Sequence, residues 1–468
     1  MNYRQTNSLQ SPSRMLPSTD WMVILLFVFL SAVIILAGQA ILLNIAFPGM
    51  ALLVGLYLYL RNSILYIGFT WWLWFLTPFV RRLVDYHSVF TDPAPTLLAP
   101  IIVTSITFLT LWRNLPQSFQ VMGQPFLFCF LGIFYSFAIG LINNPIVPVI
   151  LGLLDWLCPI LFGFHLFVHW RDYPEYRQNF QKVFLWGTLV MGAYGVWQFL
   201  VAPDWDTAWL HNTQVTSFGR PRPLEIRVWS TMNGPQPFAA TLVAGLILLL
   251  TDQSKLKFAA TGFGYLAFLL SRARAPWLGW VAALFIFLPS LKSNLQMRII
   301  VSIMIAATLV VPLVQMEPFA EVIGSRLETL ASAEEDKSLD VRSQVYDRVL
   351  KLALFEVVGK GLGDQTLASA LGNDGAIVPM LFSLGWIGSI PYIGGLILLL
   401  VNLFSGSVER IDPFASAARA IVIGTFCQIS FNFVIVAPIG IVLWSFLGLN
   451  LAARKYHKYQ ATLNYPNY

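Results

Sequence analysis

The amino-acid sequence predicts an all-α protein, a polytopic transmembrane helical bundle of about 12–14 spans with one larger extracytoplasmic loop. Hydrophobic residues make up 57% of the 468-residue chain and charged residues only 11%, whereas soluble proteins carry roughly 25% charged residues. Lys, Arg, Asp and Glu are absent from four long stretches: 21–60, 114–154, 375–408 and 420–453. Such a chain cannot cover itself with polar surface, so soluble, disordered and disulfide-stapled classes are excluded.

The charge-free stretches place the predicted spans. A helical span needs about 20 apolar residues, so each stretch can hold one or two helices. Residues 24–30 do not alternate between polar and apolar, which favours helices over a transmembrane barrel. The second and third spans could also form one re-entrant unit. The predicted spans lie near 21–41, 45–60, 64–80, 96–112, 122–142, 148–169, 180–201, 237–251, 258–270, 276–290, 298–314, 376–402, 419–436 and 438–452.

The basic residues of the short loops predict the orientation. With both termini in the cytoplasm, most of these residues lie inside, as the positive-inside rule requires. We therefore expect a multi-pass protein of the cytoplasmic (inner) membrane. The net charge of +6 follows from these loops and indicates no nucleic-acid partner. The predicted organisation is a cytoplasmic tail (1–20), transmembrane helices (21–314) with external Arg-bearing loops at 202–236 and 271–275, a large extracytoplasmic loop (315–375), C-terminal transmembrane helices (376–452) and a cytoplasmic tail (453–468).

Arginine is concentrated in the three predicted external loops, although external loops normally contain few cations. The planar guanidinium group matches the geometry of a phosphate. Alternatively, each arginine pairs with a nearby acid or with a lipid headgroup. Arg81 and Arg82 fall in a further loop, whose side the pattern does not fix. The arginines of the three loops are Arg220, Arg222 and Arg227; Arg272 and Arg274; and Arg326, Arg342 and Arg348.

The long loop 315–375 contains three features of interest. Apolar residues at 341, 345, 349 and 352 predict one face of a helix over 340–356, which Arg342 and Arg348 flank. The glycines of 359–363 are typical of a helix C-cap and tight turn, and a phosphate-cradling loop is the less favoured alternative. Asp374 directly precedes a span, where it fits either an N-cap or a reactive carboxylate.

Four stretches within about 210–390 resemble the O-antigen ligase and polymerase superfamily of bacterial membrane glycosyltransferases, whereas the first half of the chain matches only as generic spans. The first is Arg227-Val-Trp-Ser-Thr-Met-Asn233-Gly-Pro, similar to the family's "nPN" element, and the second is Ser271-Arg272-Ala273-Arg274-Ala275-Pro276-Trp277-Leu278-Gly279, similar to its "SRgawlG" hairpin. The third is Asp340-Val341-Arg342 with Tyr346 and Gly359-Lys-Gly-Leu-Gly363, similar to "R…w…PllGxG". In the fourth, nine residues separate Asp374-Gly375 from Gly385-Trp386-Ile387-Gly388, which is similar to the spacing of the ligases' His-Asn and GxxG.

The resemblance implies a GT-C-like fold and a polyprenyl-diphosphate-linked glycan donor. It also implies a sugar or lipid-sugar acceptor, a surround of membrane lipids, and partner proteins of a polysaccharide assembly pathway. The implied reaction inverts the anomeric centre. We expect neither a cofactor nor a metal, because no acidic pair or His cluster of the external loops has evident metal-ligand spacing.

The resemblance also implies roles for individual residues. Asp374 is the implied base that deprotonates the acceptor hydroxyl. The family's ligases have His at this position and Asn at the next, which is Gly375 here, and this departure favours a polymerase or a divergent ligase. The implied diphosphate-binding residues are Arg274 and Arg342, with support from Arg272, Arg227 and Arg348.

Three other functions remain open. A transporter of small ions such as bicarbonate is favoured by Asp155, an acid well inside a span, although a hydrogen-bonded structural Asp explains it equally. A flippase for lipid-linked oligosaccharides would need cations on both faces of a cavity, and the spans contain almost none. A non-catalytic scaffold is the third. His165 and His169 are spaced like a metal pair, but an interfacial aromatic belt is the favoured interpretation.

Overall fold

The computed structural model describes residues 18–120, 122–316, 349–364, 375–405 and 412–464. The regular structure of these residues is helical, with one isolated bridge between Gly219 and Ile226. Eight helical segments among them are long and apolar enough to cross a membrane. The predicted all-α transmembrane helical bundle is therefore confirmed, and the chain is a multi-pass membrane protein. The total of 12–14 spans stays a prediction.

The helices fall into three groups by length and composition. The eight long apolar segments contain α1 (Ser18–Leu36), α2 (Leu43–Arg61), α3 (Ser63–His87), α4 (Leu98–Ser105) in series with α5 (Phe108–Ser118), α6 (Gln124–Asn143), α7 (Ile146–Val168), α8 (Tyr173–Val201) and α17 (Ile377–Asn402). Shorter apolar helices are α10 (Pro235–Leu249), α11 (Lys257–Leu270), α12 (Arg274–Phe287) and α18 (Pro413–Phe426). The others are α9 (Asp204–Thr213), α13 (Ser293–Gln315) and α19 (Ile439–Asn464).

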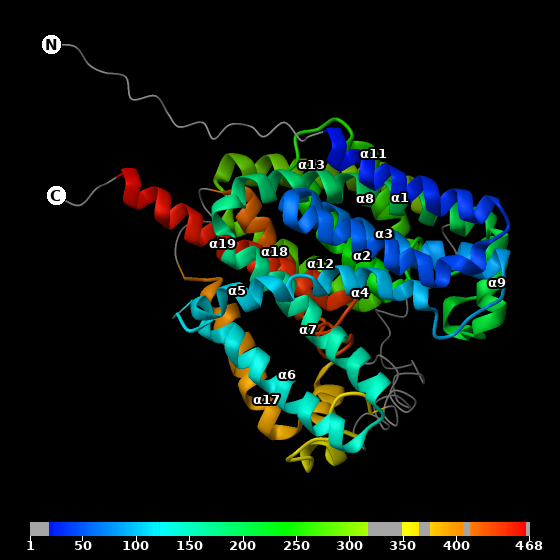
Figure 1. The fold of residues 1–468 in the computed structure, drawn as a ribbon. Coiled ribbons are helices and arrows are strands. Elements are labelled where there is room, and N and C mark those ends of the chain that lie inside the picture. Colours follow the sequence, from blue (N-terminus) through cyan, green and yellow to red (C-terminus); the bar gives the residue numbers. More distant parts are fainter. Residues whose placement is uncertain (1–17, 121, 317–348, 365–374, 406–411, 465–468) are drawn as a thin grey trace.

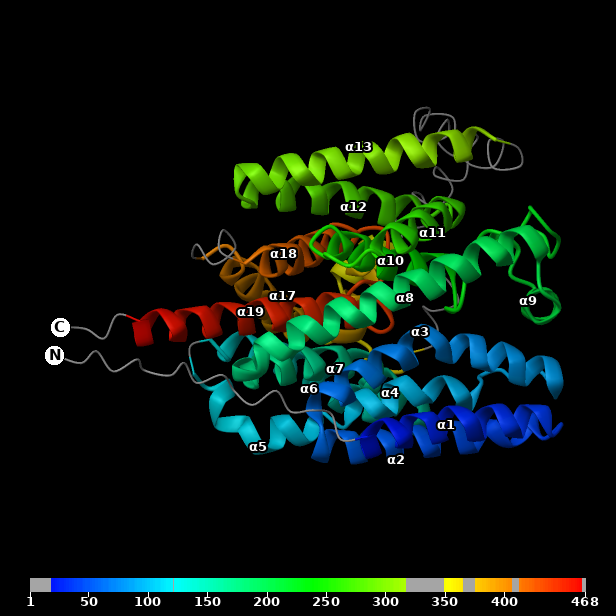
Figure 2. The same ribbon diagram turned by 90° about the horizontal axis from the view of Figure 1, so that it is seen from above.

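The bundle is assembled from pairs of helices that are often far apart in the sequence. Helix α6 packs on α17, α7 on α19, α8 on α11, and α12 on α18. Figure 1 shows α6 and α17 side by side, and in Figure 2 most helices run along one common direction. Helix α9 lies at one end of that direction and the last turns of α19 lie at the other (Figure 2). We call these the α9 end and the α19 end.

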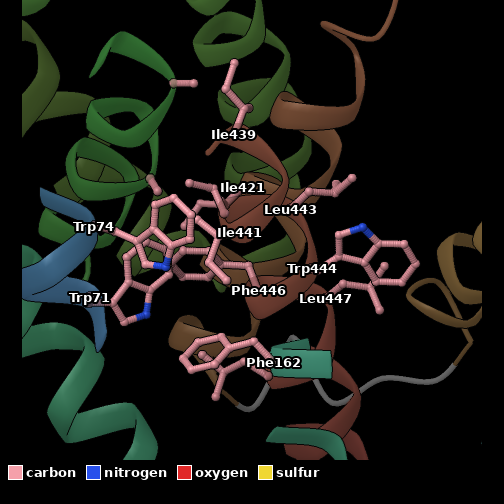
Figure 3. Packing of buried hydrophobic residues seen from close by; sticks show 14 of the residues in the cluster. Trp71, Trp74, Phe162, Ile421, Ile439, Ile441, Leu443, Trp444, Phe446 and Leu447 are labelled. Carbon is pink, nitrogen blue, oxygen red and sulfur yellow. The ribbon is translucent and has the colours of Figure 1, made fainter. Parts of the chain in front are cut away.

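Helix α19 passes through the middle of the packed side chains. Its residues Trp444, Phe446 and Leu447 are fully buried, and Figure 3 shows them in one cluster with Trp71 of α3 and Phe162 of α7. The Phe446 ring lies 5.3 Å from the Phe184 ring of α8. The Trp71 ring lies 4.8 Å from the Phe184 ring in an edge-to-face arrangement. Because lipid tails are as apolar as these side chains, close van der Waals packing stabilises the association of the helices.

Glycines allow two of the helix pairs to approach backbone to backbone. A Cβ atom added at Gly163 would lie 2.4 Å from the Trp444 carbonyl oxygen, so α7 and α19 touch at this point. Added Cβ atoms at Gly279 and Gly424 would each lie 2.4 Å from the other residue's carbonyl oxygen, which places α12 against α18 in the same way. Small residues at such crossings are typical of membrane helices.

Helix α17 is interrupted near its start, and another segment fills the break. Gly385 has φ +61°, a left-handed conformation that glycine adopts without strain. The carbonyl groups of Phe382 and Ser383 accept hydrogen bonds from the backbone N–H groups of Lys360 and Gly361, at 2.7 and 3.1 Å. In the other direction, the N–H groups of residues 386 and 387 donate to the carbonyls of residues 356 and 357. The loop therefore satisfies the backbone groups that the break exposes.

Some predicted boundaries are wrong. The third span extends well beyond residue 80, because α3 continues to His87 with Arg81 and Arg82 inside the helix. The span predicted at 419–436 begins earlier, since Asp412 caps α18, and residues 427–438 form turns. The second and third spans are two separate helices, not a single re-entrant unit. Of the helix predicted at 340–356, residues 349–354 are helical and residues before 349 lie outside the described part.

The break in α17 gives a testable prediction. Gly385→Ala should destabilise the protein by about 1–3 kcal/mol, because φ +61° is unfavourable for alanine and its Cβ would lie 2.3 Å from the Val358 carbonyl carbon. The measurement is thermal unfolding of the detergent-purified protein. Gly394→Ala in the same helix is the matched control, since a Cβ there meets nothing within 4 Å. Equal melting temperatures for the two variants would contradict the prediction.

Candidate functional site

Three non-helical segments are packed between helices, and they form the candidate region for a functional site. They are residues 226–234 before α10, residues 356–363 against α17, and residues 427–438 between α18 and α19. Irregular backbone within an apolar bundle is tolerated where protein groups bond it or where it lines a polar cavity. Interrupted helices of this kind form the binding sites of many membrane proteins.

Two of the arginine-bearing loops are joined directly. The Nε of Arg227 donates a hydrogen bond to the Ser271 carbonyl at 2.6 Å, and the N–H of Val228 donates to the Leu270 carbonyl at 3.2 Å. Loop 202–236 therefore touches the hairpin 271–275. Among the predicted substrate-binding residues, Arg227 and Arg272 lie on touching segments, and Arg274, within the same hairpin, is the first residue of α12.

Arg272 has an unusual backbone and an unsatisfied side chain. Its φ is +50°, a conformation that side chains other than glycine rarely adopt and that is frequent at functional sites. Its Nε is buried and has no hydrogen-bond partner among the described residues, while its Nη2 lies 3.5 Å from the Glu225 carbonyl. Burial lowers the pKa of this guanidinium group. A buried donor without a partner indicates that a ligand or solvent oxygen belongs beside it.

Other arginines of loop 202–236 behave as ordinary surface residues. Arg220 is exposed and forms an exposed ion pair with Glu225 at 3.6 Å, and Arg222 is also exposed. Such pairs contribute little to stability. For Arg220 the alternative of pairing with a local acid therefore applies.

A cluster of amide side chains lies between the ends of α10 and α18. Asn432 donates to Gln428 at 3.0 Å and lies 3.5 Å from the Gln236 side-chain oxygen. Gln428 also lies against α12, because a Cβ added at Gly279 would lie 2.5 Å from its Nε2 atom. Arg274 begins α12 five residues before Gly279, about 7.5 Å further along the helix axis. The amide cluster therefore lies beside α12, on the C-terminal side of Arg274 and close to the arginine-bearing hairpin.

Three predicted site residues, Arg342, Arg348 and Asp374, lie outside the described residues. Asp374 is followed by Gly375 and Ala376, which the structure does describe. The N–H of Ala376 donates to the Ile429 carbonyl at 2.8 Å, so the start of α17 is attached to the turns that carry the amide cluster. The base role of Asp374 and the diphosphate role of Arg342 and Arg348 stay predictions.

The glycine segment 359–363 is a packed turn, as the favoured interpretation predicted. Its backbone N–H groups at residues 360, 361 and 362 all donate to carbonyl groups of α17 or α6. A Cβ added at Gly361 would lie 2.2 Å from the Gly140 nitrogen, and one at Gly363 would lie 2.6 Å from the Val149 nitrogen. Because three of its five N–H groups already donate to carbonyl groups of the bundle, the bonding is that of a tight turn rather than of a phosphate-cradling loop.

The sequence reasoning missed the role of Arg81 and Arg82. Both are buried at the last turns of α3, and each is paired with an acid. Arg81 lies 3.1 Å from Asp85 in the same helix, whereas Arg82 lies 2.6 Å from Asp206 of α9. The only signal in the sequence was an adjacent pair of arginines at the end of an apolar run, which does not reveal a partner so far along the chain.

Two side chains considered as alternatives lie within α7. Asp155 accepts at its backbone carbonyl from the N–H of Ala437 at 3.1 Å, so it lies beside the turns 427–438. His165 is buried and contacts the hydroxyl groups of Thr110 and Ser63, at 2.7 and 3.3 Å. Among the residues that the structure describes, no group of three or more metal-ligating side chains is found.

A separate polar cluster lies toward the α19 end. Asp412 caps α18, accepting from the N–H of Phe414 at 3.0 Å, and its other oxygen accepts from the Tyr173 hydroxyl at 2.6 Å. His457 of α19 lies 3.1 Å from that same oxygen, and Arg177 of α8 lies 3.5 Å from the first one. Burial raises the pKa of Asp412, but bonds from His457 and Tyr173 and the Arg177 charge outweigh it and hold that pKa below its usual value. A pocket of about 340 Å³ opens beside this cluster.

Comparison with models of known protein families gives no match, and comparison with curated proteins gives none either. The resemblance to the O-antigen ligase and polymerase superfamily therefore stays a prediction from four short stretches. What the helices establish is that the chain is a multi-pass helical membrane protein with eight candidate spans in its described part.

The Asp412 cluster predicts a pH dependence of stability. A carboxyl whose pKa is lowered on folding stabilises the protein above the unfolded pKa of about 3.9, and this contribution is lost as the pH falls through the folded pKa. Asp412→Asn should therefore lower the melting temperature at pH 7, and its difference from the wild type should shrink below about pH 4. Glu175→Gln, an exposed acid near the same end, is the control. A difference that stays constant with pH would contradict the assignment.

Proposed function

We propose that this chain is a membrane glycosyltransferase of the O-antigen polymerase or ligase type. It would transfer a glycan from a polyprenyl-diphosphate carrier to a hydroxyl of a sugar or lipid-linked sugar, at the outer face of the cytoplasmic membrane. The observation that carries the proposal is the joined pair of arginine-bearing segments, in which Arg227 is bonded to the hairpin and Arg272 has a strained backbone and an unpartnered buried Nε.

The chemistry of the leaving group explains why arginines would be needed. As the glycosidic bond breaks, negative charge grows on the diphosphate, and fixed donors placed beside that charge stabilise the transition state. A guanidinium group offers several N–H donors in one plane, which match phosphate oxygens. Arg274 and Arg342 would bind the diphosphate with Arg272, Arg227 and Arg348 in support, and they would take the place of a divalent cation.

The remaining steps follow from the same proposal. Asp374 would accept the proton of the acceptor hydroxyl as that oxygen attacks the anomeric carbon. Attack on the face opposite the diphosphate would invert the anomeric centre. The amide cluster of Gln236, Gln428 and Asn432 offers hydrogen-bonding groups beneath the arginines, as sugar hydroxyls require. Apolar side chains on the lipid-facing helices would accommodate the polyprenyl chain.

A small-ion transporter is the second candidate, and specific observations favour it. Helix α17 is interrupted at Gly385, the turns 427–438 separate α18 from α19, and Asp155 lies beside those turns. Interrupted helices and intramembrane acids are typical of transporters. Uptake of bicarbonate into proteoliposomes that contain no lipid-linked sugar, lost in Asp155→Asn, would support this candidate.

The arginine assignment predicts the effect of three substitutions. Arg227→Ala and Arg274→Ala should each lower the rate of polymer formation by roughly 10²–10³-fold, as the loss of a transition-state donor does elsewhere. Arg220→Ala should leave the rate unchanged, because its ion pair with Glu225 is exposed to solvent and contributes little. The assay is donor-dependent polymer formation in membranes that contain equal amounts of each variant. Normal activity of both Arg227→Ala and Arg274→Ala would rule out the diphosphate role.

Substitution of Asp374 tests the base. Asp374→Ala should abolish transfer, and Asp374→His should retain part of it, since imidazole can also accept a proton from a hydroxyl group. The measurement is the pH profile of transfer. As the pH is lowered, the His variant should lose activity at a higher pH than the wild type does, because imidazole is protonated at a higher pH than a carboxylate. An active Asp374→Ala would leave this residue with the role of a helix cap.

A further inference from the structure

The irregular segment 228–232 is almost completely buried, so its backbone groups need protein partners. Its residues are between 0 and 3% exposed, although none of them belongs to a helix. Ser230 has φ +54°, which prevents the segment from making its own helical hydrogen bonds. In an apolar bundle each unsatisfied backbone group costs several kcal/mol. The partners of this segment therefore decide whether it can hold its shape.

Side chains of α3 and α8 supply those partners. Gln198 accepts at its Oε1 from the N–H groups of Trp229 and Ser230, at 3.1 and 2.9 Å. Arg82 donates from Nη1 to the Met232 carbonyl at 2.7 Å and from Nη2 to the Ser230 carbonyl. One guanidinium and one amide group thus hold four backbone groups of the segment. Both side chains are fully buried.

Asp206 fixes both of these side chains. Its Oδ1 lies 2.6 Å from the Arg82 Nε, a contact that is chiefly electrostatic because its angle is poor for a hydrogen bond. Its Oδ2 accepts from the Gln198 Nε2 at 2.7 Å and from the Tyr194 hydroxyl at 2.9 Å. We call Arg82, Asp206 and Gln198 the clamp. Asp206 comes from α9, so the clamp ties three helices to segment 228–232.

The contribution of the clamp to stability does not by itself explain its presence. Desolvating an ion pair costs several kcal/mol per ion, and apolar residues of similar volume often stabilise a protein equally well. Buried ionisable groups in membrane helices are therefore functional candidates. The neighbouring Arg81 shows the contrast. It is equally buried and ion-paired, but its hydrogen bonds go to residues 85, 91 and 92, and it reaches α9 through the ring of Trp209, 5.9 Å from its guanidinium carbon, rather than through a hydrogen bond to segment 228–232.

We propose that the clamp of Arg82, Asp206 and Gln198 is a positioning device that fixes segment 228–232 and so holds Arg227 and the hairpin 271–275 in place for a diphosphate group. This inference rests on the proposed function. Arg227 directly precedes the clamped segment and is bonded to Ser271, while Val228 is bonded to Leu270. A shift of the segment would therefore move both arginine-bearing loops together.

Kinetics in proteoliposomes test the positioning role. Arg82→Lys keeps the charge but cannot serve both carbonyl groups and Asp206 in the same geometry. It should raise KM for the lipid-diphosphate donor about tenfold or more, with a smaller change in kcat. Asp206→Asn keeps the shape of the side chain and removes its charge, and it should also raise KM for the donor. It takes the place of Arg82→Lys in the test if that variant fails to fold. Arg81→Lys is the matched control and should leave KM unchanged.

A labelling experiment tests the clamp without any catalytic assay. Cys129, Cys158 and Cys427 are first replaced by Ala, and Val228→Cys is then introduced next to Arg227. Val228 is fully buried, so the new thiol should react slowly with a membrane-impermeant maleimide. Adding Arg82→Lys should raise its labelling rate several-fold, and adding Arg81→Lys should not. Equal labelling in both backgrounds would overturn the clamp.

The two experiments separate the failure of this inference from the failure of the proposed function. A wild-type protein that shows no donor-dependent transfer and no binding of pyrophosphate overturns the proposed function and the diphosphate role of the clamp, even where labelling confirms that the clamp holds the segment. A wild-type protein that transfers glycan, together with an Arg82→Lys variant of normal KM, overturns the inference and leaves the proposed function intact.

Discussion

The apolar surroundings of the helices are the constraint on which the rest of this structure depends. Every backbone N–H and C=O group that leaves a helix inside the bundle must find a protein partner. Segment 356–361 bonds to the break in α17, and segment 228–232 bonds to Arg82 and Gln198. The turns 427–438 receive bonds from, or donate bonds to, Ala376 and Asp155. The irregular parts are therefore as firmly specified as the helices around them.

This constraint gives neighbouring charged residues different tasks. Arg81 and Arg82 occupy consecutive positions, but they point to different partners because a helix turns by about 100° per residue. Arg81 secures the end of α3 to the loop that follows it, and Arg82 reaches Asp206 and the segment before α10. Arg227 and Arg272 each reach a backbone carbonyl group of a neighbouring loop, that of Ser271 and that of Glu225.

The sequence allowed the membrane class and most helix positions to be predicted, because charge-free stretches and span length are properties of short segments. It also predicted that glycines 359–363 form a turn. The pairing of Arg82 with Asp206 and the filling of the α17 break by residues 356–361 could not be predicted, since each joins segments that only the folded chain brings together. The extension of α3 past residue 80 was missed because its charges, which usually end a span, are neutralised inside the bundle.

The central position of α19 has a consequence for assembly during synthesis. Helices α7, α8, α10 and α18 all contact α19, yet each of them leaves the ribosome before it. Until α19 arrives, the side chains that later surround Trp444 and Phe446 must be covered by lipid or by a helper protein. The mature packing around α19 can therefore form only after its buried residues, 439–453, have been translated.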